Sequence, residues 1–153
     1  MILEKHGEGR DDILLPSIEI CYSDGKSSGI HFHAVPHGLE WNSFQIALFN
    51  VAGPGQKLDP ELLARIRKID HQVNLKVLAT LTCSNCPTSV MSAMQIAAYN
   101  ENVSAEMFDL LHFRKLRFKY QVLSVPTLIL NGELMAVGKM SVEEMLDLIE
   151  KNA

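Results

Sequence analysis

Two cysteines separated by two residues stand where a strand pattern gives way to a helical one, in the segment Cys83-Ser84-Asn85-Cys86-Pro87. Residues 75–81 alternate as a buried strand does, and residues 86–99 have the apolar spacing of a helix. The first cysteine thus falls at a helix N-terminus, where unpaired N–H groups and the helix dipole favour a thiolate. We therefore expect Cys83 to attack a partner's disulfide and Cys86 to resolve the mixed disulfide.

A single C-x-x-C pair has two other interpretations, half of a zinc site or two unrelated core cysteines. Structural zinc takes four ligands, and the sequence adds only Cys21 and scattered histidines, among them His31, His33 and His37. An exposed hairpin face is the more ordinary place for these histidines. Cys21 is expected to be a buried, inert thiol. We predict a redox dithiol and no metal site.

The residues from 73 to 153 predict an α/β unit with the order β-α-β-α-β-β-α. Asn131-Gly132 is a strong hairpin signal, and Ser141 with Glu144 forms a capping box at the start of the last helix. Strands are expected at 75–81, 103–108, 126–130 and 133–137, and helices at 86–99, 113–120 and 142–149.

The residues from 14 to 72 predict a shorter part, a hairpin followed by two helices, fused with the second part into one globular unit. The first 13 residues are polar and are expected to be frayed. Strands are expected at 17–22 and 30–35, and helices at 39–51 and 60–69.

Val125-Pro126 stands downstream of the dithiol, just where a strand begins. The stretch 120–130 around it is similar to the thioredoxin family at the site of that family's cis-proline, which packs against the two sulfurs. The resemblance implies a cis bond before Pro126. It also implies that Val125 offers backbone groups to an extended peptide segment of a substrate.

The chain further resembles, over about residues 16–150, the N-terminal domain of the flavoprotein subunit of alkyl hydroperoxide reductase. The dithiol segment is similar to that family's C-H-N-C-P, residues 37–44 to its M-G-H-E-F-T-S-L, and residues 65–70 to its Q-I-R-D-I-D. The resemblance implies a complete thioredoxin-like half over residues 73–153. An abbreviated thioredoxin-like half precedes it over residues 14–72, where the family has a further β-α-β segment.

The resemblance implies a thiol–disulfide oxidoreductase. It would relay electrons from a flavoprotein disulfide reductase of the thioredoxin-reductase type to a peroxiredoxin or another disulfide protein. Its only redox group would be the Cys83–Cys86 disulfide. The sequence has no G-x-G-x-x-G pattern, so intrinsic flavin or NAD(P)H chemistry is not expected. Glu40 matches the glutamate of the family's H-E-F-T-S segment, which implies proton exchange with Cys86. From the residues alone it is equally a first-turn carboxylate that favours the helix dipole.

The charge and apolar content of the chain disfavour some classes of partner. The net charge of −4 disfavours nucleic acid and anionic membranes as partners, and no apolar run is long enough to cross a bilayer. The N-terminus lacks the apolar core of a signal peptide, so we expect a cytoplasmic location.

Homodimerisation through the shortened half is a further expectation. Two alternatives stay open: a glutathione-linked, glutaredoxin-like enzyme, and a non-catalytic binding or dimerisation module with a regulatory dithiol.

Overall fold

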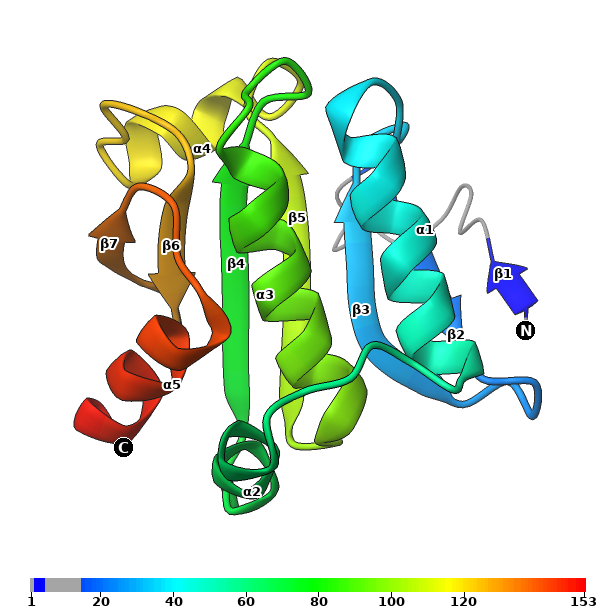
Figure 1. The fold of residues 1–153 in the computed structure, drawn as a ribbon. Helices are drawn as coiled ribbons and strands as arrows, with labels where there is room; N and C mark the ends of the chain where they lie inside the picture. The colour runs from blue at the N-terminus through cyan, green and yellow to red at the C-terminus, as the bar shows by residue number, and fades with distance from the viewer. Residues whose placement is uncertain (1, 5–14) are drawn as a thin grey trace.

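The computed structural model describes residues 2–4 and 15–153, which form a seven-stranded sheet in the order β1-β2-β3-β5-β4-β6-β7 (Figure 1). The strands are β1 (Ile2–Glu4), β2 (Ile18–Cys21), β3 (Ser27–His33), β4 (Val73–Ala79), β5 (Val103–Asp109), β6 (Thr127–Leu130) and β7 (Glu133–Val137). The helices are α1 (Leu39–Ala52), α2 (Pro60–Arg67), α3 (Cys86–Tyr99), α4 (Arg114–Lys119) and α5 (Val142–Lys151).

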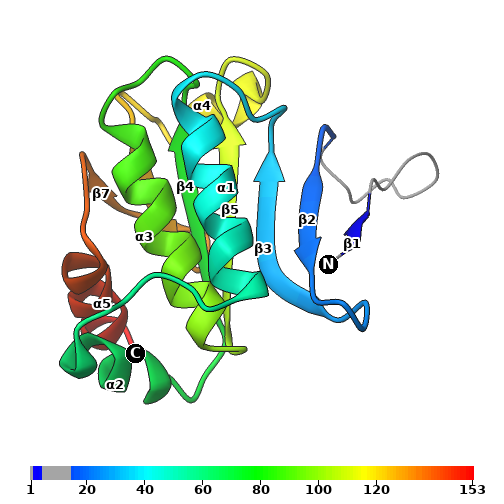
Figure 2. The ribbon, with the colours of Figure 1, turned by 45° about the vertical axis from the view of Figure 1, so that its right-hand side comes forward.

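Three parallel strands form the centre of the sheet. β5 pairs in parallel with β3 on one side and with β4 on the other, and the outer strands pair antiparallel. Helices α1 and α3 follow β3 and β4, so both begin at the edge of the sheet where the parallel strands end. They lie side by side over one face, as Figures 1 and 2 show. Residues that follow two different strands are thereby brought to one edge.

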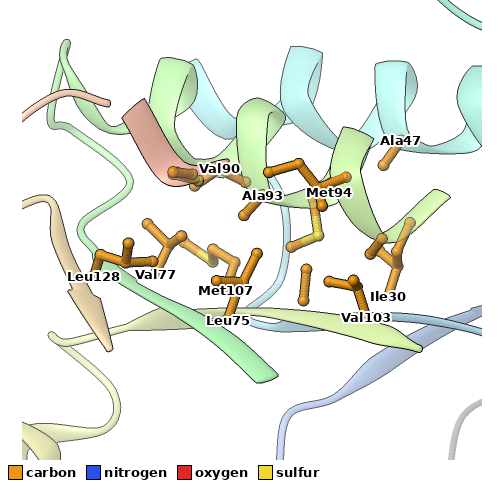
Figure 3. Packing of buried hydrophobic residues seen from close by; sticks show 14 of the residues in the cluster. Ile30, Ala47, Leu75, Val77, Val90, Ala93, Met94, Val103, Met107 and Leu128 are labelled. Carbon is orange, nitrogen blue, oxygen red and sulfur yellow. The ribbon is translucent and has the colours of Figure 1, made fainter. Parts of the chain in front are cut away.

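The main core lies between α3 and the central strands. Side chains alternate along a strand, so every second residue of β4 and β5 faces the helices. Val90, Ala93 and Met94 of α3 are at most 1% exposed. Figure 3 shows these three residues pointing toward Leu75, Val77 and Met107 of the sheet. This packing fixes the position of α3 and of the residue with which it begins, Cys86.

A smaller cluster lies on the opposite face of the sheet. It contains Leu78 and Phe108, which alternate with the residues that face α3, and Leu116 of α4 packs against it.

The same face of the sheet holds a polar group around Glu106. The Glu106 carboxylate lies 3.0 Å from Nε2 of His33 and accepts a hydrogen bond from Asn74 at 3.0 Å. Burial alone would raise the pKa of Glu106, but these hydrogen bonds outweigh it and lower that pKa to about 2.

The order predicted for residues 73–153 is confirmed, including the hairpin at Asn131-Gly132 and the capping box of Ser141 and Glu144. The hairpin and two helices of the first part are confirmed as well. The prediction of a frayed N-terminus is wrong for residues 2–4, which form β1 because they pair antiparallel with β2. The other residues of that segment lie outside the described part of the chain. No helix among the described residues is long and apolar enough to cross a bilayer.

Candidate dithiol site

The dithiol sits at the turn between β4 and α3. After Ala79 the chain turns, the Cys83 N–H donates to the Thr80 carbonyl at 3.2 Å, and α3 begins at Cys86. Pro87 lies in the first helical turn, where a missing N–H costs little. The N-cap residue, Asn85, makes no side-chain cap hydrogen bond. The positive end of the α3 dipole is therefore not capped by a side chain beside the cysteines.

The two cysteines form a disulfide, with their Cα atoms 5.4 Å apart. Their surroundings differ, because Cys86 is 0% exposed while Cys83 is only half-buried. In the reduced protein an incoming disulfide would therefore meet the Cys83 sulfur first. This asymmetry gives Cys83 the geometry of an attacking thiol and Cys86 that of an internal one.

The Val125–Pro126 bond is cis, as the family resemblance implied. The Val125 carbonyl oxygen lies 3.9 Å from Sγ of Cys83, so this loop directly adjoins the dithiol. Two hydrogen bonds hold the loop: Thr127 Oγ1 donates to the Ser124 carbonyl at 2.7 Å, and the Gly138 N–H donates to the Pro126 carbonyl at 2.8 Å. The structure thus brings together the cysteines and the loop that the sequence had linked to them.

Glu40 lies in the first turn of α1, at the same edge of the sheet as the dithiol. It is 0% exposed, and neither carboxylate oxygen has a hydrogen-bond partner among the described residues. Burial raises its pKa to about 7; the hydroxyl of Ser43, one helical turn on, offsets part of this rise without completing a hydrogen bond. A carboxyl group with a pKa raised in this way can exchange a proton near neutral pH.

The segment before Glu40 touches the segment before Cys83. Gly38 has φ +58°, a conformation that favours glycine, and a Cβ built on it would lie 3.6 Å from the Leu81 carbonyl oxygen. Farther along, Nδ2 of Asn42 in the first turn of α1 lies 4.0 Å from Sδ of Met91, the sixth residue of α3. The N-terminal parts of α1 and α3 are therefore neighbours, although no hydrogen bond joins the Glu40 carboxylate to either cysteine.

The remaining cysteine and the histidines lie elsewhere. Cys21 is 2% exposed in β2 and borders a cavity of about 170 Å³ near the far end of α1, so its predicted burial is confirmed. The expectation of an exposed histidine face is wrong for His33, which is 6% exposed and stacks on Phe108 at 4.1 Å between ring centroids. Within residues 2–4 and 15–153, no three His, Cys, Asp or Glu side chains gather as metal ligands would.

Two features of this edge are absent from the sequence-based predictions. Ser43 is 0% exposed and its hydroxyl has no hydrogen-bond partner among the residues described. Its sequence signals are its place one turn after Glu40 and its match to the serine of the family's H-E-F-T-S segment. The second feature is the composition of α4, which has four basic residues out of six. That run is visible in the sequence, but its position beside the site is not.

The thioredoxin domain family matches residues 73–150, more than half of the chain, including the dithiol and the cis-proline. The chain belongs to the thioredoxin family. The alkyl hydroperoxide reductase protein AhpF from Pseudomonas aeruginosa is 33% identical over 129 residues, which are 84% of this chain and 25% of that protein. The crystal structure of the NTD_N/C domain of alkyl hydroperoxide reductase AhpF from Enterococcus faecalis is similar with a TM-score of 0.84 at 32% identity.

The Enterococcus match covers 88% of this thioredoxin-family chain and 64% of the other chain. A protein disulfide oxidoreductase from Aeropyrum pernix shares the fold, with a TM-score of 0.81 at 20% identity over 93% of this chain and 61% of the other. These findings confirm the resemblance to the N-terminal domain of AhpF and the thioredoxin-like fold. The chain spans about a quarter of the length of the curated relatives it matches. The division into halves at residues 72 and 73 stays a prediction.

We expect limiting iodoacetamide to alkylate Cys83 of the reduced protein about tenfold or more faster than Cys86 or Cys21, because thiol reactivity follows exposure and thiolate character. Peptide mass spectrometry after acid quenching measures the three sites in one sample. Cys21, a thiol that is 2% exposed and remote from the α3 N-terminus, is the internal control. Equal labelling of Cys83 and Cys86 would contradict the assignment of Cys83 as the attacking thiol.

Proposed function

We propose that this protein is a thiol–disulfide oxidoreductase that relays electrons from a flavoprotein disulfide reductase to a protein disulfide, such as that of a peroxiredoxin. The observation that carries this proposal is the Cys83–Cys86 disulfide at the start of α3, with the half-buried Cys83 against the cis-Pro126 loop. The AhpF relatives, which are named as parts of alkyl hydroperoxide reductase, support the choice of partners. A reducing cytoplasm, the compartment expected from the sequence, suits such a relay.

The reaction begins with the reduced dithiol. The Cys83 thiolate attacks one sulfur of the partner's disulfide, forms a mixed disulfide and releases the partner's other sulfur as a thiolate. Cys86 then loses its proton and attacks Sγ of Cys83, which closes the Cys83–Cys86 disulfide and releases the partner's second thiolate. The partner gains two electrons and, from solvent or a nearby acid, two protons. The flavoprotein reductase returns two electrons to the disulfide by the same exchange in reverse.

Each part of the site is assigned a role in these reaction steps. The N–H groups at the start of α3, which no side chain of the N-cap residue occupies, stabilise the Cys83 thiolate. The backbone of Val125, beside the Cys83 sulfur, binds the extended segment that contains the partner's disulfide. We assign Val125 and Pro126 to substrate binding and the two cysteines to the chemistry.

Glu40 is assigned to proton exchange with Cys86. Cys86 is fully buried, so its thiol needs a proton acceptor inside the protein before it can attack Cys83. Glu40 lies in the first turn of α1, the helix that packs against α3, and has a pKa raised to about 7 by burial, so it can accept a proton at neutral pH and return it later. Burying a carboxyl group without partners costs stability, and a glutamate that served only the helix dipole would gain nothing from burial.

The relay itself is the first test. In a mixture of NADPH, a flavoprotein of the thioredoxin-reductase type, this protein and a disulfide-containing peroxiredoxin, we expect NADPH oxidation that requires the protein. Cys83→Ser abolishes turnover, because no attacking thiolate remains. Cys86→Ser instead traps the mixed disulfide, which non-reducing electrophoresis detects. Full turnover by Cys83→Ser would overturn the proposal. Turnover supported only by glutathione and glutathione reductase would replace it with the glutathione-linked alternative.

Glu40→Gln removes a group whose pKa is higher in the folded protein than in the unfolded chain. The folded wild type holds an extra proton between about pH 4.5 and 7, so its free energy of unfolding falls across that window, by about 2–3 kcal/mol. We expect Glu40→Gln to lack this fall, and to slow disulfide reduction about tenfold or more near neutral pH. Urea unfolding at about pH 5 and pH 8, with stopped-flow reduction rates over the same range, measures both effects.

The matched control is Glu61→Gln, since Glu61 is also a first-turn glutamate but is exposed to solvent. If Glu40 served only the helix dipole, the two variants would behave alike in stability and in rate. Retention of the pH-dependent fall in Glu40→Gln would show that another group causes it. Unchanged reduction rates in Glu40→Gln would remove Glu40 from the mechanism and leave the cysteine chemistry intact.

A further inference from the structure

Helix α4 presents an exposed surface that combines positive charge with large apolar side chains. The members of this α4 platform are all exposed: Arg114, Lys115, Arg117, Phe118, Lys119 and Leu123. Phe118 is 78% exposed and Leu123 is 95% exposed. Single exposed apolar residues are ordinary on protein surfaces. Two large apolar side chains beside four cations instead form a surface suited to a partner that has both negative charge and apolar side chains.

The charge of the α4 platform contrasts with the rest of the chain. No Asp or Glu occurs between Asp109 and Glu133, while the other ten Lys and Arg residues are outnumbered by 18 Asp and Glu. The four cations form no ion pair with the described residues. Arg114 donates to the Leu111 carbonyl at 3.4 Å, and Nζ of Lys119 lies 5.1 Å from the Tyr120 ring centroid. Because both partners are uncharged, these contacts do not neutralise the positive charges.

The platform adjoins the dithiol site through packed residues. Leu116 and Tyr120, on the inner side of α4, pack against the smaller core cluster, and Val125 packs against both that cluster and the main core. The Val125 carbonyl is the group that lies 3.9 Å from Sγ of Cys83. The Leu110 N–H donates to the Ala79 carbonyl at 2.9 Å. The segment that leads to α4 and the segment that leads to the dithiol are therefore adjacent where they leave the sheet. In both ribbon views α4 lies at the edge where α3 begins (Figures 1 and 2).

We propose that the α4 platform docks an acidic segment of the redox partner and so delivers the partner's disulfide to Cys83. This inference rests on the proposed function and names the chemistry of the partner that the site selects. The cations attract carboxylates of the segment, which raises the rate of encounter. Phe118 and Leu123 contact an apolar side chain of the same segment, the kind of anchor that slows dissociation. The segment then continues along Val125 toward the dithiol.

An acidic protein segment fits this surface better than a nucleic acid does. The basic surface is a single helix of six residues, and the remainder of the chain is strongly acidic. A long polyanion such as RNA would extend past the platform onto that acidic surface and be repelled. A short run of carboxylates beside a disulfide matches the extent of the platform, which adjoins the dithiol site through Val125.

The test compares two synthetic peptides of equal length, each with one intramolecular disulfide. Asp and Glu flank the disulfide in one peptide, and Lys flanks it in the other. The reduced wild type is expected to reduce the acidic peptide about tenfold faster at low ionic strength. The ratio is expected to fall to within about twofold in about 0.5 M salt, where charges are screened over a few ångströms. Acid quenching and chromatography give the second-order rate constants.

Two variants of equal charge change locate the effect. Lys115→Glu with Arg117→Glu is expected to invert the preference, so that the Lys peptide becomes the faster substrate; this gain also shows that the variant is folded. The control is Lys57→Glu with Arg67→Glu, which alters exposed residues at the far end of the sheet and likewise removes one basic residue from a helix's last turn. The control is expected to keep the wild-type preference.

Three results would overturn the inference. The first is equal rates for both peptides with the wild type at low salt. The second is the same loss of preference in the control as in the α4 variant. The third is tight binding of a single-stranded oligonucleotide that only the α4 variant loses, with no peptide preference, which would assign the platform to nucleic acid. Failure of the reduced wild type to reduce the neutral compound 2-hydroxyethyl disulfide would instead show that the proposed function itself is wrong.

Discussion

The packing of α3 against β4 and β5 is the interaction on which the site depends. It buries one face of the helix completely and so fixes where the helix begins, at the end of β4. Cys86 becomes the first buried residue of that helix, and Cys83 stays in the half-exposed turn before it. The difference in exposure between the two sulfurs, on which their proposed roles rest, therefore arises from the position of one helix end relative to the core.

The parallel pairing of β3, β5 and β4 adds the second part of the site. Because α1 and α3 follow parallel strands, both begin at one edge of the sheet and pack against each other, and Glu40 is buried in the first turn of α1. Burying a carboxyl group that has no hydrogen-bond partner among the described residues costs stability. The proposed proton exchange with the buried Cys86 thiol would explain why a carboxyl group with a pKa raised to about 7 is kept there.

Local sequence was sufficient for the dithiol and for the order of elements, because apolar spacing, turn residues and caps are local signals. Burial that depends on distant segments was not predictable. Residues 2–4 form a strand only because they pair with the edge of β2, and His33 is covered by Phe108, which is distant in sequence and lies in β5. The positive charge of α4 can be read from the sequence, but the position of α4 beside the site follows from the tertiary packing of Leu116 and Tyr120.

The midpoint potential of the Cys83–Cys86 couple tests the central claim most directly. Titration with dithiothreitol redox buffers, with Cys83→Ser as the control, measures it. A protein that passes electrons from a flavoprotein to protein disulfides should show a two-electron transition near about −270 mV or lower, the range of thioredoxin. A potential near about −200 mV would contradict that role and favour a glutathione-linked or oxidising one. If no disulfide formed in solution, the oxidoreductase account would be wrong.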